Sequence, residues 1–573
     1  MLVEHLCYKI VLMESGITPS LAEQPSVMAQ EAHQSPRWRK AVAVLGVMTA
    51  TLSGCTVTSP GHTLPAHVRI MEIPPETNTP STGPTSTPEI PTSVKHPNIV
   101  FILTDDLSQN LMPYMPNTNR LIRDQGAQLN VEVEQSLCCT SRSTILTGLY
   151  SHNTKVVGNN YPLGGYGAYH KYDEQYALPV WLKKAGYTTS FIGKYLNEYP
   201  SPVGQPSAGV NPSFVPPGWD HFFTPVAGHP YGQFNEVFSD DGKVDSKPRH
   251  RYENDIFSDR TVKELRNMSK DKPFMLSVDT YSPHAPSAFP ARYAGLYPSV
   301  QYPRTSAFDE ADMSDKPAPL GNAKPLSNEL KTKIDSDFRK RVLSVQSVDE
   351  MVGKIERTLK ARHMLQNTYI FFMSDNGYHM GEHREGIGKY DQYQTTLSVP
   401  LYVSGPGIKP GTDYRNVLAS NIDIAPTIAA MTGATPLRAV DGVSLLDVLK
   451  GGQPDADHRY VLIGRGAMPH YTTGEPGTVE PPDPTAKRDY NLLHDFQGVY
   501  DGTYKYVRLS KTGKPLEEFY DERNDPYELN NLLGANDDKF NTLSPDLQQK
   551  VVAMRLALQR LLTCAGASCR IAE

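Results

Sequence analysis

The sequence run Ser136-Leu-Cys-Cys-Thr-Ser-Arg-Ser-Thr-Ile-Leu-Thr-Gly148 combines two adjacent cysteines, several hydroxyl side chains, one arginine and a helix-compatible apolar end. A cysteine just before a helix lies where free backbone N–H groups and the helix dipole favour an anion. Arg142 follows Cys138 by four residues and adds a fork of donors suited to sulfate or phosphate. The run alone fits buried structural thiols equally well, because free cysteine is among the most buried residue types.

The composition is that of a soluble globular protein. The chain has 573 residues, of which 39% are hydrophobic and 21% charged, and this length allows a large core. A net charge of −6 gives no reason to expect nucleic-acid binding. Six cysteines are too few for a disulfide scaffold. Cys564 and Cys569 lie close together at the C-terminus and predict one disulfide, which requires an oxidising compartment.

Residues 1–55 read as a signal region. A basic cluster at 37–40 precedes an apolar run at 41–52, and Leu52-Ser-Gly-Cys55 resembles a bacterial lipobox. This predicts a protein of the bacterial cell envelope, outside the cytoplasm and held on the membrane by lipid at Cys55. The alternative is an ordinary signal peptide that is cleaved nearby. Met28 is a candidate for the true start, because a long tail before the basic cluster is unusual.

The rest of the chain divides into three parts. Residues 56–96 are rich in Pro, Thr and Ser and predict a solvated tether. Residues 97–459 alternate apolar strand-like and amphipathic helix-like segments, which predicts an α/β domain with a large, mostly parallel sheet. From about residue 460 the pattern changes, and residues 460–573 predict a small antiparallel sheet with a final helix.

Acidic residues follow two of the predicted strands. The apolar run 97–104 ends in Asp105 and Asp106, and the run 369–373 is followed by Asp375 and Asn376. Carboxylates at the end of a buried strand repel one another unless a cation lies between them. Hard oxygen ligands favour Ca²⁺, with Mg²⁺ as the second candidate, over zinc. Each pair alone is more often a turn or a helix cap.

In chain order these motifs resemble the type I sulfatase family, over about residues 97 to 573. The family signature is Cys-x-Pro-Ser-Arg followed by a Leu-Thr-Gly-type helix. The segment Gly193-Lys-Tyr-Leu-Asn-Glu-Tyr199 looks most like the N-acetylglucosamine-6-sulfatase and arylsulfatase branch. The resemblance implies an alkaline-phosphatase-like fold and a hydrolase of sulfuric esters, acting on a sulfated small molecule or glycan.

The family pattern also implies roles for individual residues. A maturation enzyme oxidises Cys138 to formylglycine, whose hydrate attacks sulfur and forms a covalent sulfo-enzyme intermediate. Arg142, Lys194 and Lys389 bind the sulfate, and His284, which stands between prolines after a predicted strand, protonates the leaving oxygen. The implied metal ligands are Asp105, Asp106, Cys138, Asp375 and Asn376. Taken alone, its segment would make Lys194 a surface lysine, and for His284 the alternative is a structural loop histidine.

Two positions depart from the family pattern. Thr140 stands where the signature has proline, and Leu196 where many members have a histidine; Asn197 and His152 are the candidates to replace it. Two rival functions stay open. One is a phosphate or phosphonate ester hydrolase on the same scaffold, since the pocket would fit either tetrahedral anion. The other is a non-catalytic, glycan-binding lipoprotein in which Cys138 is not converted.

Overall fold

The computed structural model describes residues 96–200, 212–228, 230–453, 460–465, 495–510 and 515–570. All of them belong to one unit of the chain, residues 86–573. The predicted signal region, Cys55 and the tether up to residue 95 lie outside the described residues. Within the described part, no helix is both long and apolar enough to cross a membrane.

A ten-stranded sheet forms the centre of the fold, and β1 lies in its middle. β1 (Asn98–Asp105) pairs in parallel with β7 (Phe274–Pro283) on one side and β8 (Thr368–Ser374) on the other. All eight β1 residues are buried, as expected for a continuous apolar run covered on both faces. The other strands are β3 (Thr188–Gly193), β4 (His221–Ala227), β5 (Val237–Asp240) and β6 (Lys243–Val244) beyond β7, and β11 (Ser398–Ser404), β2 (Gly126–Glu132) and β12 (Thr412–Asp413) beyond β8.

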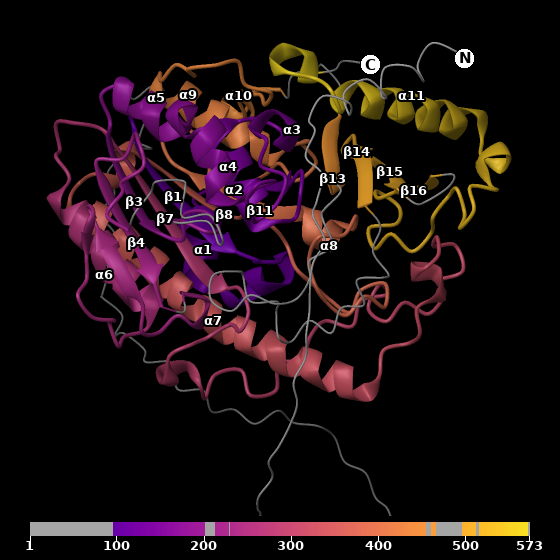
Figure 1. Ribbon diagram of the computed structural model, residues 1–573, viewed down its shortest axis with the longest axis horizontal. Coiled ribbons are helices and arrows are strands. Elements are labelled where there is room, and N and C mark those ends of the chain that lie inside the picture. Colours follow the sequence, from indigo (N-terminus) through magenta and orange to yellow (C-terminus); the bar gives the residue numbers. More distant parts are fainter. Residues whose placement is uncertain are drawn as a thin grey trace, which may run out of the picture. The chain divides into compact units, whose positions relative to one another are not determined.

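Helices cover both faces of this sheet (Figure 1). The long helices α6 (Glu253–Asn267) and α7 (Asn328–Ala361) bury one face. The other face packs against α2 (Cys138–Thr147), α5 (Leu178–Lys184) and α9 (Ile424–Thr432). Shorter elements are α1 (Pro116–Thr118), α3 (Ser151–Thr154), α4 (Gly165–Tyr172), α8 (Gln394–Leu397), α10 (Leu446–Leu449), β9 (His379–Met380) and β10 (Ile387–Gly388). The predicted mostly parallel α/β fold is confirmed.

The helix α7 shows how the apolar pattern sets the core. Helical spacing predicts a buried stripe, and every member of it is buried in the structure: Val342, Val345, Val348, Val352, Ile355 and Leu359. The helix begins at Asn328, and Ile334 and Phe338 extend the same buried face toward its start. Its first turn is capped by Ser327, whose hydroxyl accepts a hydrogen bond from the Leu330 amide.

The C-terminal part contains the predicted small sheet. It is four-stranded and antiparallel, and α11 (Pro545–Leu561) packs on it through an apolar cluster. The strands are β13 (Val461–Arg465), β14 (Asp495–Tyr500), β15 (Tyr504–Ser510) and β16 (Leu516–Asp521). The predicted Asp-Gly turn joins β14 to β15, and the Asp501 carboxylate accepts from the amides of Thr503 and Tyr504.

The predicted disulfide between Cys564 and Cys569 is confirmed, and its loop is attached to the segment after α2. One carboxylate makes the attachment. Asp441 accepts a 2.7 Å hydrogen bond from the Gly566 amide through Oδ1 and a 2.8 Å bond from the Tyr150 amide through Oδ2. The end of the chain is therefore tied to the residues that directly follow α2.

Candidate active site

The candidate site lies at the C-terminal end of β1. The register of β1 with β8 pairs Thr104 with Ser374, so Asp105 and Asp106 come beside Asp375 and Asn376. All four of these polar residues are fully buried. Asp106 has a left-handed backbone (φ 65°), a conformation that is uncommon for residues other than glycine.

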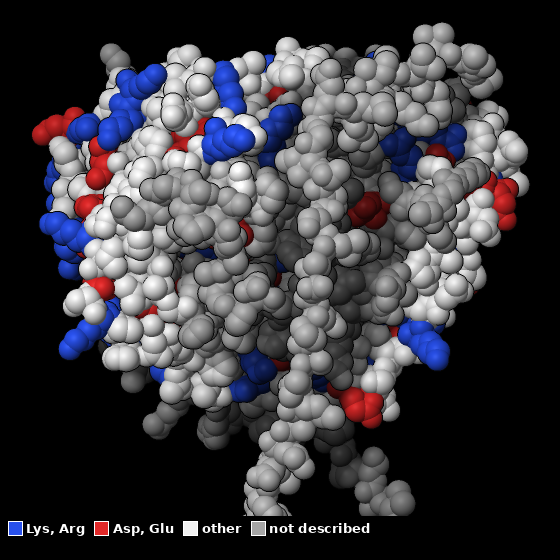
Figure 2. Space-filling view, in the orientation of Figure 1, with Lys and Arg blue, Asp and Glu red and all other residues white. Residues whose placement is uncertain are grey.

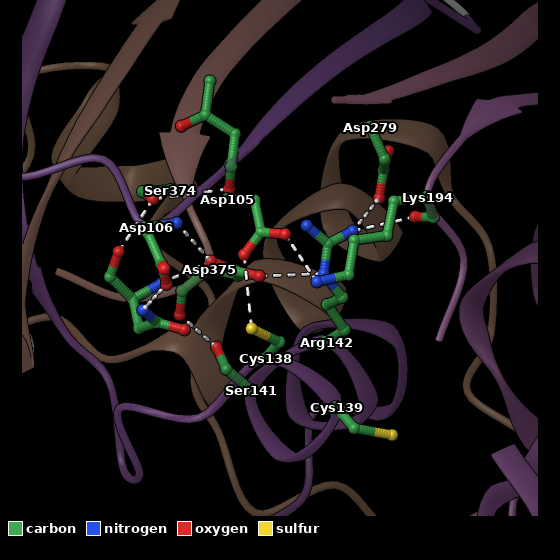
Figure 3. A network of polar contacts seen from close by, with 12 residues as sticks. Asp105, Asp106, Cys138, Cys139, Ser141, Arg142, Lys194, Asp279, Ser374 and Asp375 are labelled. Atoms are coloured by element: carbon green, nitrogen blue, oxygen red, sulfur yellow. Dashed lines mark hydrogen bonds and ion pairs between the residues drawn. The ribbon is translucent and has the colours of Figure 1, made fainter. Parts of the chain in front are cut away.

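The helix α2 supplies the cysteine and the arginine. Leu137 is its extended N-cap and Cys138 its first residue, and the helix ends at Gly148 in the left-handed region (φ 70°). The Cys138 Sγ lies 3.2 Å from Oδ1 of Asp105 and 2.7 Å from Nζ of Lys389. Arg142 comes one turn later on the same face of the helix. Figure 3 shows Cys138 within this polar network and the sulfur of Cys139 pointing away from it.

The two cysteines therefore differ in chemistry. The Cys139 amide donates to Asn159, its side chain packs in an aromatic cluster, and burial raises the pKa of its thiol to about 12. A thiol with that pKa is neither a nucleophile nor a metal ligand at neutral pH. The geometry supports Cys138, the residue that the family spacing selects, as the reactive position.

The Arg142 guanidinium is held from three sides. Nε donates to Oδ2 of Asp375 at 2.8 Å, and Nη1 donates to the Lys194 carbonyl at 2.8 Å and to Oδ2 of Asp279 at 3.3 Å. Nη2 is buried and has no hydrogen-bond partner among the described residues. Burial by itself lowers the pKa of Arg142, but Asp375, Asp105 and Asp279 raise it above its ordinary value. A fixed cation thus keeps one donor for an anion.

Lys194 enters the site from the end of β3. Its Nζ lies 2.5 Å from Oδ2 of Asp105 and over the rings of Tyr231 and Tyr281. Burial alone lowers the pKa of Lys194, whereas the Asp105 carboxylate raises it well above the usual range. Gly193 makes this approach possible, since a Cβ there would lie 1.8 Å from the Asp279 carbonyl oxygen.

His284 and Lys389 complete the ring of cationic groups. Lys389 Nζ lies 2.6 Å from Oδ1 of Asp106, and His284 Nε2 lies 3.5 Å from Oδ2 of the same carboxylate. His284 Nδ1 is 2.7 Å from the Ala285 carbonyl oxygen, which only accepts, so Nδ1 carries a proton and Nε2 faces the site. The Tyr231 ring packs against the imidazole at a centroid distance of 4.6 Å.

The acidic residues have the properties of a cation site. Oδ2 of Asp106 and Oδ1 of Asn376 are buried and accept no hydrogen bond from any described residue. Ligand atoms of Asp105, Asp106, Cys138 and His284 all lie within 4.8 Å of one another. Burial, and then the charge of Asp105, raise the pKa of Asp375 to about 6, while nearby cations hold the pKa of Asp105 below its usual value. These oxygen donors fit a hard divalent cation.

The structure brings together every residue that the sequence predicted for the site. The positions converge from six separate parts of the chain, and they are Asp105, Asp106, Cys138, Arg142, Lys194, His284, Asp375, Asn376 and Lys389. Asn197 and His152, the two candidates to replace the family histidine at position 196, lie in different parts of the structure. Asn197 donates to the Tyr231 hydroxyl at the edge of the site, whereas His152 contacts the Cys564 carbonyl at the disulfide loop. Leu196 packs in the aromatic cluster.

Two contributors were not predicted from the sequence. Asp279, within β7, accepts from Arg142, and its neighbour Ser277 donates to its Oδ1 at 2.6 Å. Burial raises the pKa of Asp279 to about 7, and the Arg142 charge opposes this. The Ser141 hydroxyl donates to the Asp375 carbonyl at 2.5 Å. A carboxylate within the strand that precedes His284 was the available signal for Asp279.

Comparisons with known proteins agree with this geometry. The sulfatase family model matches residues 97–434. The N-acetylglucosamine-6-sulfatase of Capra hircus is 32% identical over 502 residues, which cover 83% of this chain and 85% of that protein. A protein solved with its substrate D-glucosamine-2-N,6-O-disulfate superposes with a TM-score of 0.59 at 22% identity, covering 81% of this chain and 98% of that one. The phosphonate monoester hydrolase of Agrobacterium radiobacter gives 0.58 at 20% identity, covering 80% and 95%.

Proposed function

Since this chain belongs to the sulfatase family and is a sulfuric ester hydrolase, we propose that it removes a sulfate group from a sulfated sugar at the site around residue 138. The observation that carries the proposal is the position of Cys138. Its Sγ faces Asp105 and Lys389, and Arg142 on the next turn offers a buried donor to an anion. The formation of formylglycine from Cys138 is part of the proposal.

Formylglycine explains why a cysteine occupies this position. As a hydrated aldehyde, it supplies an oxygen nucleophile and a second hydroxyl, neither of which a thiol provides. The thiol is buried in the folded protein, so a maturation enzyme must reach it before the chain has folded. Asp105 and Lys389 contact the position where that oxygen would stand.

A divalent cation, which we propose to be Ca²⁺, fits the oxygen donors of Asp105, Asp106, Asp375 and Asn376 together with residue 138. When bound, such an ion polarises a sulfuryl oxygen and lowers the pKa of a coordinated hydroxyl. Its charge would also offset the repulsion between the buried carboxylates.

The chain's own cations bind and orient the sulfate. Arg142 presents Nη2, and the ammonium groups of Lys194 and Lys389 stand on either side of Asp105 and Asp106. These fixed charges stabilise the negative charge that spreads over the sulfuryl oxygens as the ester bond breaks. His284, whose Nε2 faces the same space, delivers a proton to the departing alcohol.

For the substrate, we propose a glucosamine unit that carries a 6-O-sulfate, within a sulfated glycan or as a small sugar. The support is the name of the relative from Capra hircus and the disulfated glucosamine held by the structural neighbour. An aryl sulfate is the convenient model substrate. The phosphonate hydrolase is alike in fold alone, so the assays should compare sulfate and phosphate esters of one phenol.

We also propose that the enzyme works outside the cytoplasm of a bacterium, with a lipid anchor at Cys55. The Cys564–Cys569 disulfide supports an oxidising compartment. A long tether would then allow the folded unit to reach substrates away from the membrane surface.

Two variants test the proposal, and they differ by one position. Cys138→Ala should abolish turnover of 4-nitrophenyl sulfate, whereas Cys139→Ala should retain it, because the Cys139 side chain faces the aromatic cluster. Both should keep a cooperative melting transition. Mass spectrometry of the peptide with residue 138 should show an aldehyde in place of the thiol. Near wild-type activity in Cys138→Ala, or a fully unconverted cysteine in an active enzyme, would refute the mechanism.

A further inference from the structure

A surface groove of about 700 Å³ lies between α6 and α7, outside the site described above. Each helix contributes one stripe of side chains at helical spacing. The charged residues in its lining are Asp259, Lys263, Arg266, Lys354, Arg357 and Arg362. Figure 2 shows Lys and Arg side chains along the edge of the molecule where Figure 1 places α6.

The groove is strongly basic although the chain as a whole carries a net charge of −6. Its one acidic residue, Asp259, already pairs with Arg251 at 2.9 Å. Within the described part of the chain, none of Lys263, Arg266, Lys354 and Arg357 forms an ion pair with an acid. These four cations are therefore available to an anionic partner.

The favourable interaction of cations with the C-terminal ends of helices accounts for only some of these basic residues. Arg362 donates to the carbonyls of Arg266 and Met268 at 2.6 Å and so caps the end of α6. Arg266 lies in the last turn of α6, where a cation is favourable. Lys354 is two turns before the end of α7 at Ala361, beyond the reach of that effect. The helix-end effect therefore does not account for Lys354.

The groove and the candidate site are joined by α6. Near the start of this helix, Asn254 donates a 2.7 Å hydrogen bond to Ser282, two residues before His284. At a rise of 1.5 Å per residue, the groove residues of α6 lie between about 8 and 20 Å further along the helix axis. A single sugar in the site would not reach the groove, whereas a polymer could contact both.

We propose that this groove binds a sulfated glycan chain at sugar units distant from the ester being cleaved, which rests on the proposed function. Basic side chains on two adjacent helices match the regularly spaced sulfate groups of such a polymer. The groove thus raises the affinity for polymeric substrates and leaves the chemistry at residue 138 unchanged.

The test is a charge-reversed variant of the full chain that carries Lys263→Glu, Arg266→Glu, Lys354→Glu and Arg357→Glu. The matched control carries glutamate at four exposed basic positions outside the groove: Lys184, Lys243, Lys409 and Arg560. Reversal of all four charges should weaken binding to heparin at least about tenfold, because each introduced carboxylate repels the sulfate groups. The control should bind heparin like the wild type, and kcat/KM for 4-nitrophenyl sulfate should be unchanged in both.

Two results would contradict the proposed glycan-binding groove. Equal retention of the groove variant and the control on immobilised heparin would overturn the proposal. So would a groove variant that loses binding to phosphatidylglycerol vesicles but keeps its affinity for heparin, since the partner would then be a membrane surface. Failure of the proposed function would instead appear as an inactive wild type, and the heparin measurement would still test the groove.

Discussion

Arg142 donates through Nε to Oδ2 of Asp375 at 2.8 Å, and this contact joins the two halves of the site. Arg142 belongs to the helix that carries Cys138, whereas Asp375 follows β8 and precedes Asn376, whose buried Oδ1 belongs to the proposed cation site. A change in the position of either residue must therefore move both the anion site and the cation site.

Asp279 orients Arg142, and its removal should weaken the anion site. In Asp279→Asn the Arg142 guanidinium still donates to Asp375, but it loses its charge-assisted hydrogen bond to a second carboxylate. We expect kcat/KM for 4-nitrophenyl sulfate to fall about tenfold, which corresponds to about 1.4 kcal/mol. Asp546→Asn, an exposed change on α11, is the matched control. Equal activity of both variants would contradict a positioning role for Asp279.

Thr140→Pro should restore the family signature without harm to the fold. Thr140 is the third residue of α2, where the backbone N–H has no partner within the helix. Its hydroxyl is buried and makes no hydrogen bond to any described residue. We expect a larger fraction of residue 138 to carry the aldehyde, measured by peptide mass spectrometry, with activity rising in proportion. A lower melting temperature with unchanged conversion would show that this threonine supports the fold instead.

Removal of the cation should destabilise the protein as well as inactivate it. A ligand present at a hundred times its Kd adds about 2.7 kcal/mol to the free energy of unfolding. Treatment with EGTA should therefore lower the melting temperature, and added Ca²⁺ should restore it. Asp106→Asn should abolish this response, because it removes a buried oxygen charge from the cation site. A melting temperature that is unchanged by EGTA in the active enzyme would argue against a resident calcium ion.

The pH dependence of stability should contain a contribution from Glu134. This carboxyl accepts from the Ser151 amide at 2.6 Å, and burial raises its pKa to about 8. The folded state then holds a proton that the unfolded state releases near pH 4.5, so stability is lost as the pH rises through this window. The loss is about 1.4 kcal/mol per pH unit and ends near pH 8.

Glu134→Gln mimics the protonated carboxyl and removes this loss. Its free energy of unfolding, measured by urea denaturation, should exceed that of the wild type by more at pH 7.5 than at pH 5.5. A difference between the two proteins that does not change with pH would show that Glu134 is ionised in the folded state.

The sequence was most informative where a polar residue directly follows an apolar strand. Asp105 and Asp375 stand at such positions, and parallel pairing of β1 with β8 brings them together. Cys138 was identified from a motif with fixed spacing to Arg142. Asp279 could not be assigned a role in this way, because its role depends on a guanidinium from a distant helix, which no local pattern records.

Short elements and long-range caps were also beyond prediction. The strands β5 and β6 have only four and two residues, so they lack the long apolar run that revealed β1. The start of the helix α7 is set by Ser327, which caps it, and a capping serine is common in loops as well. His152 was a candidate for the site on residue type alone, and only the tertiary structure shows it at the disulfide loop.

The hydrogen bonds that Asp441 accepts from the Tyr150 and Gly566 amides have a consequence for the order of events during synthesis of the chain. Residues 441 and 566 are synthesised long after Cys138, so the segment that follows α2 cannot form these two bonds until most of the chain has been made. Cys138 is fully buried once the domain has folded, so an enzyme that converts it, as proposed above, would have to act within that interval.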